Sequence, residues 1–281
     1  MPELPEVEMR RLYLEATSLG QPIDLITVED NKLLTTDLTT LVESLQNRRF
    51  QGTRRVGKNL FIYTDDPAII VRMHFGMTGD LTYYHHSVDR PRHARIVFYF
   101  KNGFCLGFIC PRKFERVGLV NDIDAYLRLK KIAPDALLID VDTLTEKFKK
   151  RNSPIKTVLL DQATTAGLGN WIVDEVLFQA KVHPSSISAK LTDDAIQAIH
   201  NAIHLVLETA ISKEATYRNF PLSFLIHARQ WDASPYEDPE TYKHCPRCGN
   251  NLDIIKVGGR TTYFCPTEQV LSAYQLVSDR R

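Results

Sequence analysis

The sequence predicts an α+β protein with an N-terminal β-sandwich, preceded by one helix, and a helical C-terminal half. Short β-type runs fill the chain up to about residue 120, and from about Ile123 the apolar spacing becomes helical. A third observation is a cluster of cysteines near the C-terminus, in a stretch with a turn-like glycine pair. We therefore divide the chain into three parts, residues 1–122, 123–238 and 239–281.

The 281 residues, 43% of them hydrophobic, suffice for one large or two modest domains. No apolar run approaches the ~20 residues that span a bilayer, and the N-terminus lacks the basic-then-apolar order of a signal peptide. We expect a cytoplasmic monomer without a membrane partner, associated with the nucleoid if the source is bacterial. The net charge of +1 gives no global argument for nucleic acid.

Basic residues nevertheless bunch along the chain. The bunches lie within residues 48–58, 90–95, 112–116 and 147–151. Such clusters suit contacts of one protein face with phosphates. Solvated surface charge explains any single cluster equally well.

In the N-terminal half we expect a first helix over about residues 6–18, followed by strands. The clearest strands are apolar runs bounded by turn residues, namely Asn59 to Thr64, Ala68 to His74, Ala94 to Phe100 and Phe104 to Ile109. Asn102-Gly103 separates the last two runs and is a strong hairpin signal.

In the C-terminal half, Thr192 offers an N-cap to a long helix. Its buried stripe is predicted from 3-4 spacing to comprise Ile196, Ile199, Ile203, Val206 and Ala210. Upstream, a glycine turn leads into an amphipathic helix over residues 171–181. The apolar segment 217–226 lies in a stretch without glycine and is expected to be helical or packed.

The first residues carry the sharpest chemical signal. Removal of Met1 would turn Pro2 into a free secondary amine beside Glu3 and Glu6. Such an amine can attack a sugar aldehyde carbon and form a cationic iminium, and it titrates near neutral pH. The alternative is that this proline and these acids only begin the first helix, near its positive end.

The C-terminal cysteines follow a metal-ligand spacing. Cys245-x2-Cys248 is followed, after sixteen residues, by Cys265-x2-Glu268. We expect a structural Zn²⁺ held by three thiolates, with Glu268 or the nearby His244 as the fourth ligand. The alternative is a hairpin that folds without metal. No organic cofactor is expected.

The order of the motifs resembles the formamidopyrimidine-DNA glycosylase and endonuclease VIII family over nearly the whole chain. The motifs are the N-terminal segment, Lys58, Met77 between glycines, Arg112 with Phe114, Gly167 to Asn170, and the cysteine cluster. Leu4 places the chain nearer the formamidopyrimidine branch. The resemblance implies a helix-two-turns-helix element in the helical domain and a zinc-ribbon hairpin at the end.

The resemblance implies that the chain is a DNA repair enzyme, a bifunctional DNA glycosylase and abasic-site lyase. It would flip and excise damaged, oxidised bases from double-stranded DNA, and cut the abasic site by β/δ-elimination. Pro2 would attack C1′, Glu3 would protonate the sugar ring or the leaving base, and Glu6 would support the N-terminal segment. The residues that would hold phosphates or the damaged nucleotide are Lys58, Asn170 and Arg260.

Three further residues match those that fill the void left by an extruded nucleotide. Met77 and Phe114 would wedge into the stack, and Arg112 would bond the orphaned base. The alternative is that Met77 and Phe114 are core residues. The chain departs from the family at Cys110, in place of an aspartate, and at Glu115, in place of a small residue.

Two other classes of function fit the sequence less well. A non-catalytic paralogue that binds abasic, branched or distorted DNA would not need Pro2 beside Glu3. A zinc-ribbon transcription accessory protein would leave the whole N-terminal segment unexplained.

Overall fold

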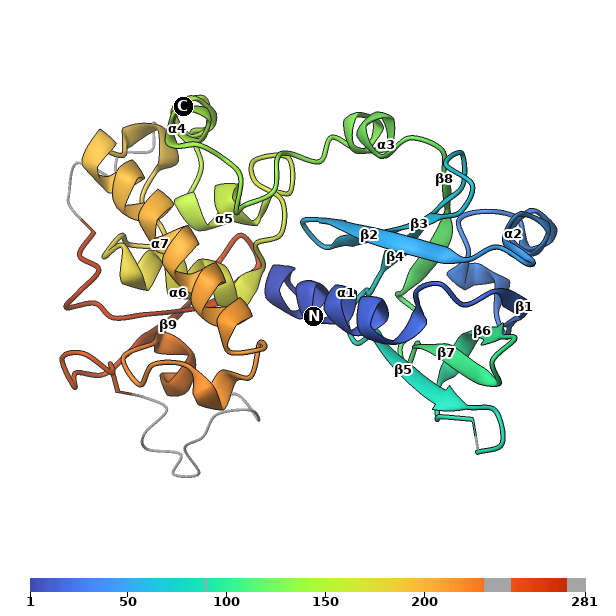
Figure 1. The fold of residues 1–281 in the computed structure, drawn as a ribbon. Coiled ribbons are helices and arrows are strands. Elements are labelled where there is room, and N and C mark those ends of the chain that lie inside the picture. Colours follow the sequence, from blue (N-terminus) through green and yellow to red (C-terminus); the bar gives the residue numbers. More distant parts are fainter. Residues whose placement is uncertain (89, 230–243, 272–281) are drawn as a thin grey trace. The chain divides into compact units, whose positions relative to one another are not determined.

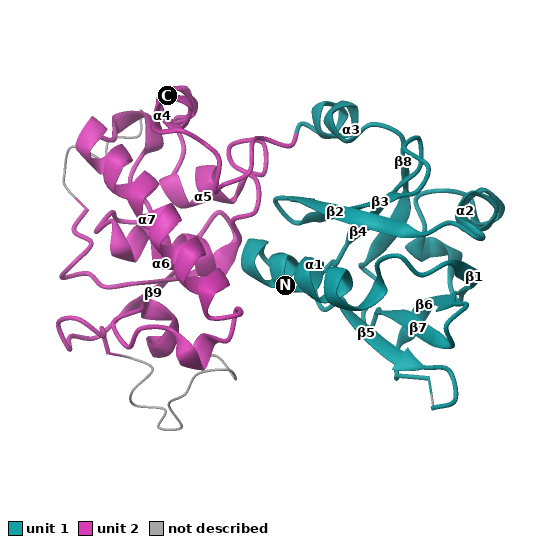
Figure 2. Ribbon diagram, viewed as in Figure 1, with its two compact units in different colours: residues 1–131 teal, residues 132–281 magenta. Residues whose placement is uncertain are grey.

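The computed structural model describes residues 1–88, 90–229 and 244–271, and forms two compact units, residues 1–131 and 132–281 (Figure 2). The three-part division of the chain stays a prediction, and its boundary at residues 238–239 lies outside the described residues. Among the helices described, none is long and apolar enough to cross a membrane.

Unit 1 contains two four-stranded antiparallel sheets (Figure 1). One sheet has the strand order β1 (Ile23–Val28), β6 (Ala94–Phe100), β7 (Phe104–Ile109) and β5 (Asp80–His85). The other has the order β2 (Phe50–Val56), β3 (Asn59–Thr64), β4 (Ile70–His74) and β8 (Arg116–Val120). Both sheets contribute to one apolar core, in which the rings of Phe50 and Phe98 lie 5.7 Å apart. The predicted β-sandwich is confirmed.

The predicted strands β3, β6 and β7 have the expected bounds. Strand β4 begins two residues later than predicted because the amides of Ala68 and Ile69 both bond to Asp66, which prolongs the turn. Between β6 and β7, the Asn102 side chain accepts a hydrogen bond from the Phe104 amide at 3.0 Å. The hairpin predicted at Asn102-Gly103 is therefore confirmed.

The first helix, α1 (Leu4–Ser18), begins two residues before the predicted start because Glu3 is its N-cap. Helix α2 (Leu38–Leu45) and the short 3-10 helix η1 (Asn31–Leu33) were not predicted. Helix α3 (Ile123–Leu129) lies within unit 1. Its Tyr126 ring packs on Phe61 of β3 at 5.9 Å, which explains why α3 joins the sandwich.

In its described residues, 132–229 and 244–271, unit 2 consists of helices and a β-hairpin. Its helices are α4 (Val141–Lys149), α5 (Ile155–Leu160), α6 (Asn170–Gln179) and α7 (Asp193–Ser212), with 3-10 helices η2 (Ser188–Lys190), η3 (Tyr217–Asn219) and η4 (Leu225–Ala228). The hairpin pairs β9 (Asp253–Val257) with β10 (Arg260–Phe264). All five predicted stripe residues of α7 are buried, and Thr192 caps the helix through the Ala195 amide.

Helix α6 differs from expectation. Every residue from Trp171 to Phe178 is buried, so the predicted amphipathic pattern was wrong. Neighbouring elements, among them α5, α7, η4 and β10, pack around this helix and enclose its polar residues as well. Asp174 and Glu175 are therefore ionisable groups inside the unit, and each requires a partner.

The apolar segment 217–226 is packed, as predicted. Phe220, Phe224 and Leu225 are buried. The Glu175 carboxylate accepts hydrogen bonds from the Leu225 and Ile226 amides at 3.1 and 2.9 Å, which ties the segment to α6. Burial raises the pKa of Glu175 to about 7.

Candidate functional site

The N-terminal segment is held by a reciprocal cap. The Glu3 amide donates to Glu6 Oε2 at 2.9 Å, and the Glu3 side chain accepts from the Glu6 amide. This capping box stabilises the first turn of α1. Pro2 and Glu3 are buried. The two readings of this segment are therefore compatible, because the same residues that begin the helix also place Pro2 beside a carboxylate.

Arg10 connects the first turn of α1 to the loop that carries Met77. Its guanidinium donates to the Glu6 carbonyl at 2.7 Å and to the Gly79 carbonyl at 3.0 Å. It also lies 5.3 Å from the centre of the Phe75 ring and 3.2 Å from Asp80 Oδ1. Arg10, which sequence reasoning missed, therefore fixes the Met77 loop (residues 75–79) to the N-terminal helix.

A second connection runs from α1 to the turn that carries Lys58. Arg55 donates from Nε to Glu8 Oε2 at 2.9 Å and from Nη1 to the Gly57 carbonyl at 3.1 Å. Burial alone would raise the pKa of Glu8, but hydrogen bonds from Arg11 and Arg55 hold it below its ordinary value. The turn between β2 and β3 is thus tied to the same helix as Pro2 and Glu3.

His74, at the end of β4, faces this turn. Burial, together with the charges of Arg72 and Lys58, lowers the pKa of His74 to about 4. Its Nδ1 lies 3.2 Å from the Gly76 amide, which donates to it. A neutral His74 therefore accepts from the Met77 loop, and its protonation would place one more cation beside Lys58.

The residues predicted to fill the void lie on two adjoining loops. Met77 is 38% exposed and Phe114 is 51% exposed, so neither is a core residue. The Arg112 guanidinium lies over the Phe114 ring at 5.4 Å. Gly76 has a φ of +54°, and a Cβ there would come within 2.6 Å of the Phe114 carbonyl carbon. The Met77 loop and the Phe114 loop (residues 111–115) therefore pack directly together.

The two family departures lie inside the protein. Cys110 and Glu115 have no exposed surface. Cys110 is part of the sandwich core, and burial together with the charge of Glu115 raises the pKa of its thiol. Neither side chain can contact DNA in this conformation, so any effect on the opposite base acts through the loops above them.

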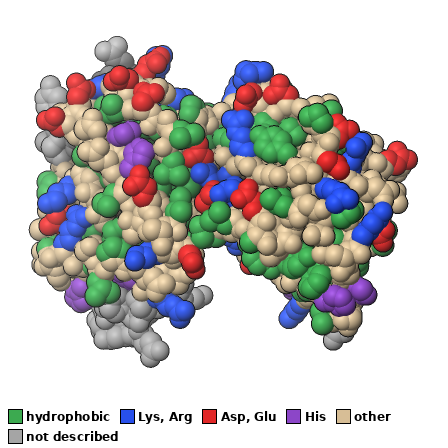
Figure 3. All heavy atoms as spheres, viewed as in Figure 1, with side chains coloured by type: hydrophobic (Ala, Val, Ile, Leu, Met, Phe, Trp, Pro, Cys, Tyr) green, Lys and Arg blue, Asp and Glu red, His purple; other side chains and the backbone are tan. Residues whose placement is uncertain are grey.

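The basic clusters are largely paired with acids. Figure 3 shows Lys and Arg side chains interspersed with Asp and Glu over the visible face. Pairs within the clusters include Arg48 with Asp66, Arg95 with Glu29, Lys113 with Asp30 and Arg151 with Asp161. The local bunching thus produces partly exposed ion pairs, and contacts with phosphates stay a prediction for these residues.

In unit 2 the structure brings Asn170 and the Arg260 turn together. Asn170 is the first residue of α6, and its Nδ2 donates to the Thr261 carbonyl at 3.1 Å. Its Oδ1 is buried without a hydrogen-bond partner in the described part of the chain. Arg260, next to Thr261, is exposed at the start of β10. The Thr261 carbonyl thus connects the N-terminus of α6 to the hairpin residue that follows Arg260.

A buried ionic cluster beneath this contact was missed by sequence reasoning. Lys156 Nζ lies 2.6 Å from Asp174 Oδ1 and donates to the Thr261 carbonyl at 3.0 Å. Arg229 is 3.4 Å from the other oxygen of Asp174. Burial raises the pKa of Asp174, against the charges of Arg229 and Lys156. The cluster joins α5, α6 and β10.

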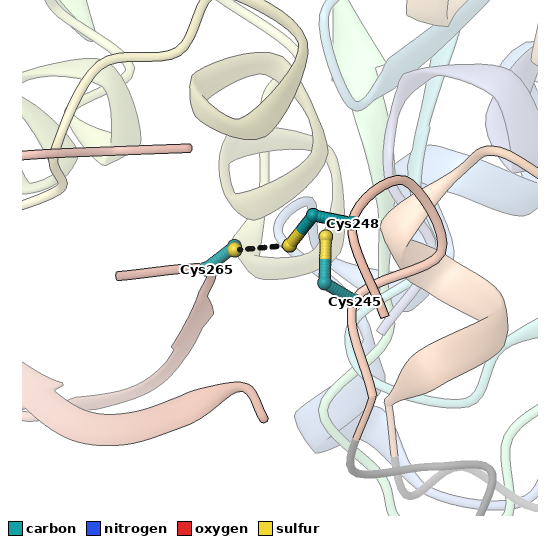
Figure 4. Close-up of side chains that lie close together, drawn as sticks. All are labelled: Cys245, Cys248 and Cys265. Atoms are coloured by element: carbon teal, nitrogen blue, oxygen red, sulfur yellow. Dashed lines mark hydrogen bonds between the residues drawn. The ribbon is translucent and has the colours of Figure 1, made fainter. Parts of the chain in front are cut away.

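The three cysteines converge at the base of the hairpin (Figure 4). Cys245 and Cys248 come from the loop before β9, and Cys265 follows β10. Their sulfurs lie within 4.8 Å of one another, and Cys248 Sγ is 3.5 Å from Cys265 Sγ. Tetrahedral zinc with Zn–S bonds of about 2.3 Å places sulfurs about 3.8 Å apart. The donor set therefore fits zinc.

The fourth ligand is a separate question. In the described residues the metal-compatible group contains only the three cysteines. Glu268 pairs with Lys181, with 3.1 Å between Oε2 and Nζ, while His244 is exposed and bridges to Asn251. Glu268 as a ligand stays a prediction, because its carboxylate lies outside this group and one of its oxygens pairs with Lys181.

Each unit thus gathers its own set of predicted residues. In unit 1, α1 connects Glu3 and Glu6 to the Lys58 turn and the Met77 loop. In unit 2, Asn170 lies beside the Arg260 turn. The missed residues are those that position the others, and they include Glu8, Arg10, Arg55, His74, Lys156 and Asp174.

Comparison with known proteins decides the family. Residues 1–117 match the formamidopyrimidine-DNA glycosylase N-terminal domain, residues 132–220 its H2TH domain, and residues 243–267 the zinc finger found in FPG and IleRS. A formamidopyrimidine-DNA glycosylase of Streptococcus pneumoniae is 36% identical over 274 residues, which cover 96% of this chain and 99% of the relative. The chain belongs to the formamidopyrimidine-DNA glycosylase family.

Other relatives support this family. The formamidopyrimidine-DNA glycosylase of Arabidopsis thaliana is 32% identical over 292 residues, with 96% of this chain and 71% of the plant protein covered. The Lactococcus lactis enzyme bound non-covalently to DNA with an AP site is similar in structure, with a TM-score of 0.82 and 29% identity over 96% of this chain and 100% of that one. Its complex with DNA containing FAPY-dG gives a TM-score of 0.82 and 30% identity over the same shares.

The predicted resemblance is therefore confirmed. The chain is a DNA repair enzyme of the bifunctional glycosylase and abasic-site lyase class, and the similar Lactococcus lactis structures hold damaged DNA. Its helical unit contains the H2TH domain, and its C-terminal hairpin is a zinc finger with Cys245, Cys248 and Cys265 at the candidate metal site.

Proposed function

We propose that the chain excises oxidised bases from double-stranded DNA and cuts the abasic site through a Schiff base at Pro2. After removal of Met1, the Pro2 nitrogen attacks C1′ of the flipped nucleotide, and the base leaves with a proton from Glu3. The C1′–O4′ bond then breaks as O4′ takes up a proton, which opens the sugar ring and gives the iminium. The iminium draws electrons from the sugar, so loss of a C2′ proton expels the 3′ phosphate and loss of a C4′ proton expels the 5′ phosphate, by β- and δ-elimination. The observation that carries this proposal is the attachment of the Lys58 turn and Met77 loop to α1.

The remaining residues hold the substrate. Glu6 supports the N-terminal segment through the capping box. Lys58, Asn170 and Arg260 hold phosphates, for which an ammonium, a helix N-terminus and a guanidinium are each suited. The space left in the base stack is filled by Met77, Arg112 and Phe114. This role is supported by the exposure of Met77 and Phe114 on adjoining loops and by the position of Arg112 over the Phe114 ring.

Zinc serves a structural role in this proposal. We assign its ligands as Cys245, Cys248, Cys265 and Glu268, because three thiolates already supply most of a tetrahedral shell. The metal would fix the hairpin that carries Arg260. The enzyme acts as a monomer. It works in the cytoplasm, on the genomic DNA.

Trapping with borohydride tests the proposed nucleophile. We expect protein whose Met1 removal is verified by mass spectrometry to form a covalent adduct with abasic-site DNA, and Pro2→Gly to form none. Glu3→Gln is expected to slow base release, with helix content checked because Glu3 also caps α1. The exposed Glu43→Gln on α2 is the matched control.

Two results would contradict the proposal. If processed wild-type protein binds abasic DNA but gives no adduct, the non-catalytic alternative gains support. Incision of a panel of duplexes with single lesions tests the substrate class, and activity restricted to undamaged or alkylated bases would contradict the choice of oxidised bases.

A further inference from the structure

Glu115 is an unusual residue for a loop that meets DNA. The four residues before it, 111–114, are exposed, whereas Glu115 has no exposed surface. A carboxylate is rarely buried without a partner, because it loses its hydration. Its Oε2 has no hydrogen-bond partner in the described residues. Such a group calls for a physical explanation.

The side chain of Glu115 lies beneath the Met77 loop. Thr78 Oγ1 donates to Glu115 Oε1 over a long 3.4 Å. A Cβ at Gly79 would come within 2.7 Å of Glu115 Cγ, and a Cβ at Gly76 within 2.8 Å of the Glu115 amide nitrogen. Both glycines beside Met77 thus lie too close to residue 115 to accept a Cβ, Gly79 against its side chain and Gly76 against its main chain.

Besides the hydrogen bond from the Gly76 amide to His74, the Met77 loop is supported from two sides. Arg10 holds the Gly79 carbonyl from the side of α1, and Glu115 supports the loop from the side of Phe114. A small side chain at position 115 would remove the second support and leave a void beneath Gly79. The Met77 loop would then keep its main-chain contact with the Phe114 loop at Gly76 but would lose the side-chain support at Gly79.

We propose that Glu115 is a positioning residue that couples the Met77 loop to the Phe114 loop, so that both side chains enter the base stack as one rigid unit. This inference rests on the proposed role of Met77 and Phe114 at the extruded nucleotide. When the Met77 and Phe114 side chains are held in fixed positions relative to each other, the orphaned base has fewer accessible positions. Glu115 therefore also influences which opposite base is accepted.

The test uses full-length protein and a duplex with 2-aminopurine beside an uncleavable abasic analogue, where fluorescence rises as the base unstacks. Glu115→Ala is expected to lose most of this rise and to release a damaged base about tenfold more slowly, as misplaced groups do. Its affinity for undamaged duplex stays that of wild type. Glu115→Gln, which keeps the side-chain volume, restores the rise, and Glu43→Ala is the matched control.

A wild-type fluorescence rise in folded Glu115→Ala would overturn the coupling. Thr78→Val provides the second measurement, because it leaves Glu115 in place and removes only the hydroxyl. If Glu115→Ala does not fold, an unchanged rise in Thr78→Val overturns the inference, and a partial loss supports it.

The Met77→Ala variant separates this inference from the proposed function. If Met77→Ala loses the rise while Glu115→Ala keeps it, the wedge stands and the coupling is wrong. If Met77→Ala keeps the full rise, the proposed wedge is wrong and the inference falls with it.

Discussion

Lys156 and Asp174 form an ion pair that is fully withdrawn from solvent, with 2.6 Å between Nζ and Oδ1. The lysine comes from α5 and the aspartate from α6, and Lys156 also donates to the Thr261 carbonyl of β10. The pair thus holds the hairpin that carries Arg260 against the helix that begins with Asn170.

The first prediction concerns this pair. Removing one member of a buried ion pair costs about 3–5 kcal/mol, because the other charge stays buried. For Lys156→Met we expect a loss of about 3 kcal/mol in the free energy of unfolding, at the lower end of that range because Arg229 still faces Asp174. DNA affinity should also fall, since the Arg260 turn loses a support.

Urea denaturation and a DNA titration measure the two effects. Lys150→Met is the matched control, because Lys150 is 69% exposed and pairs with Glu146 on the surface, where a pair contributes less than about 1 kcal/mol. Equal losses in the two variants would show that burial of the Lys156 pair is not what stabilises the hairpin.

Local signals in the sequence predicted much of the fold. Asn102-Gly103 specifies its own turn, and the α7 stripe reflects contact with a single face, so each pattern follows from one neighbour. The amphipathic pattern predicted for α6 was wrong because several elements surround this helix. The sequence alone therefore placed Asp174 on a side that faces solvent. A buried charge is recognised only when its partner is known, and the partner Lys156 is eighteen positions away.

The site shows the same division. Pro2, Lys58, Met77 and Asn170 could be proposed from motifs, since each lies in a short recognisable segment. Their supports could not, because Glu8 and Arg55 are 47 positions apart and carry no local signal. Arg55 instead looked like one more member of a basic surface cluster.

The second prediction tests the support of the Lys58 turn. In Arg55→Lys, an ammonium cannot reproduce the fork that bonds both Glu8 and the Gly57 carbonyl. We expect the single-turnover rate of base release to fall on the order of 10- to 100-fold as Lys58 shifts, with folding largely retained. Arg48→Lys is the control, since Arg48 pairs with Asp66 at a more exposed position. Similar rates in both variants would exclude this positioning role.

The third prediction concerns acid sensitivity at His74. Its pKa is about 4 in the folded protein against an ordinary 6.5, so the unfolded chain binds the proton more readily between these values. Neutral His74 therefore makes its full contribution to the free energy of unfolding above pH 6.5. This contribution is lost as the pH falls towards 4 and the unfolded chain takes up the proton. A difference of this size corresponds to about 3 kcal/mol. His74→Gln is expected to flatten that part of the curve, as measured by urea denaturation at several pH values. Parallel curves for the two proteins would contradict it.

The last prediction concerns zinc and its ligands. Cys265 is buried, and its sulfur lies beside that of Cys248. Cys265→Ser should therefore abolish zinc binding and, with it, the structure of the hairpin.

The fourth ligand is tested by Glu268→Gln, which should weaken zinc retention against a chelator while leaving the three thiolates able to bind. Lys181→Met is the informative companion, because it frees Glu268 from its ion pair and should strengthen retention if the carboxylate is the fourth ligand. Metal content measured after dialysis distinguishes the variants, and a Glu268→Gln protein that retains zinc as firmly as wild type would exclude Glu268 from the shell.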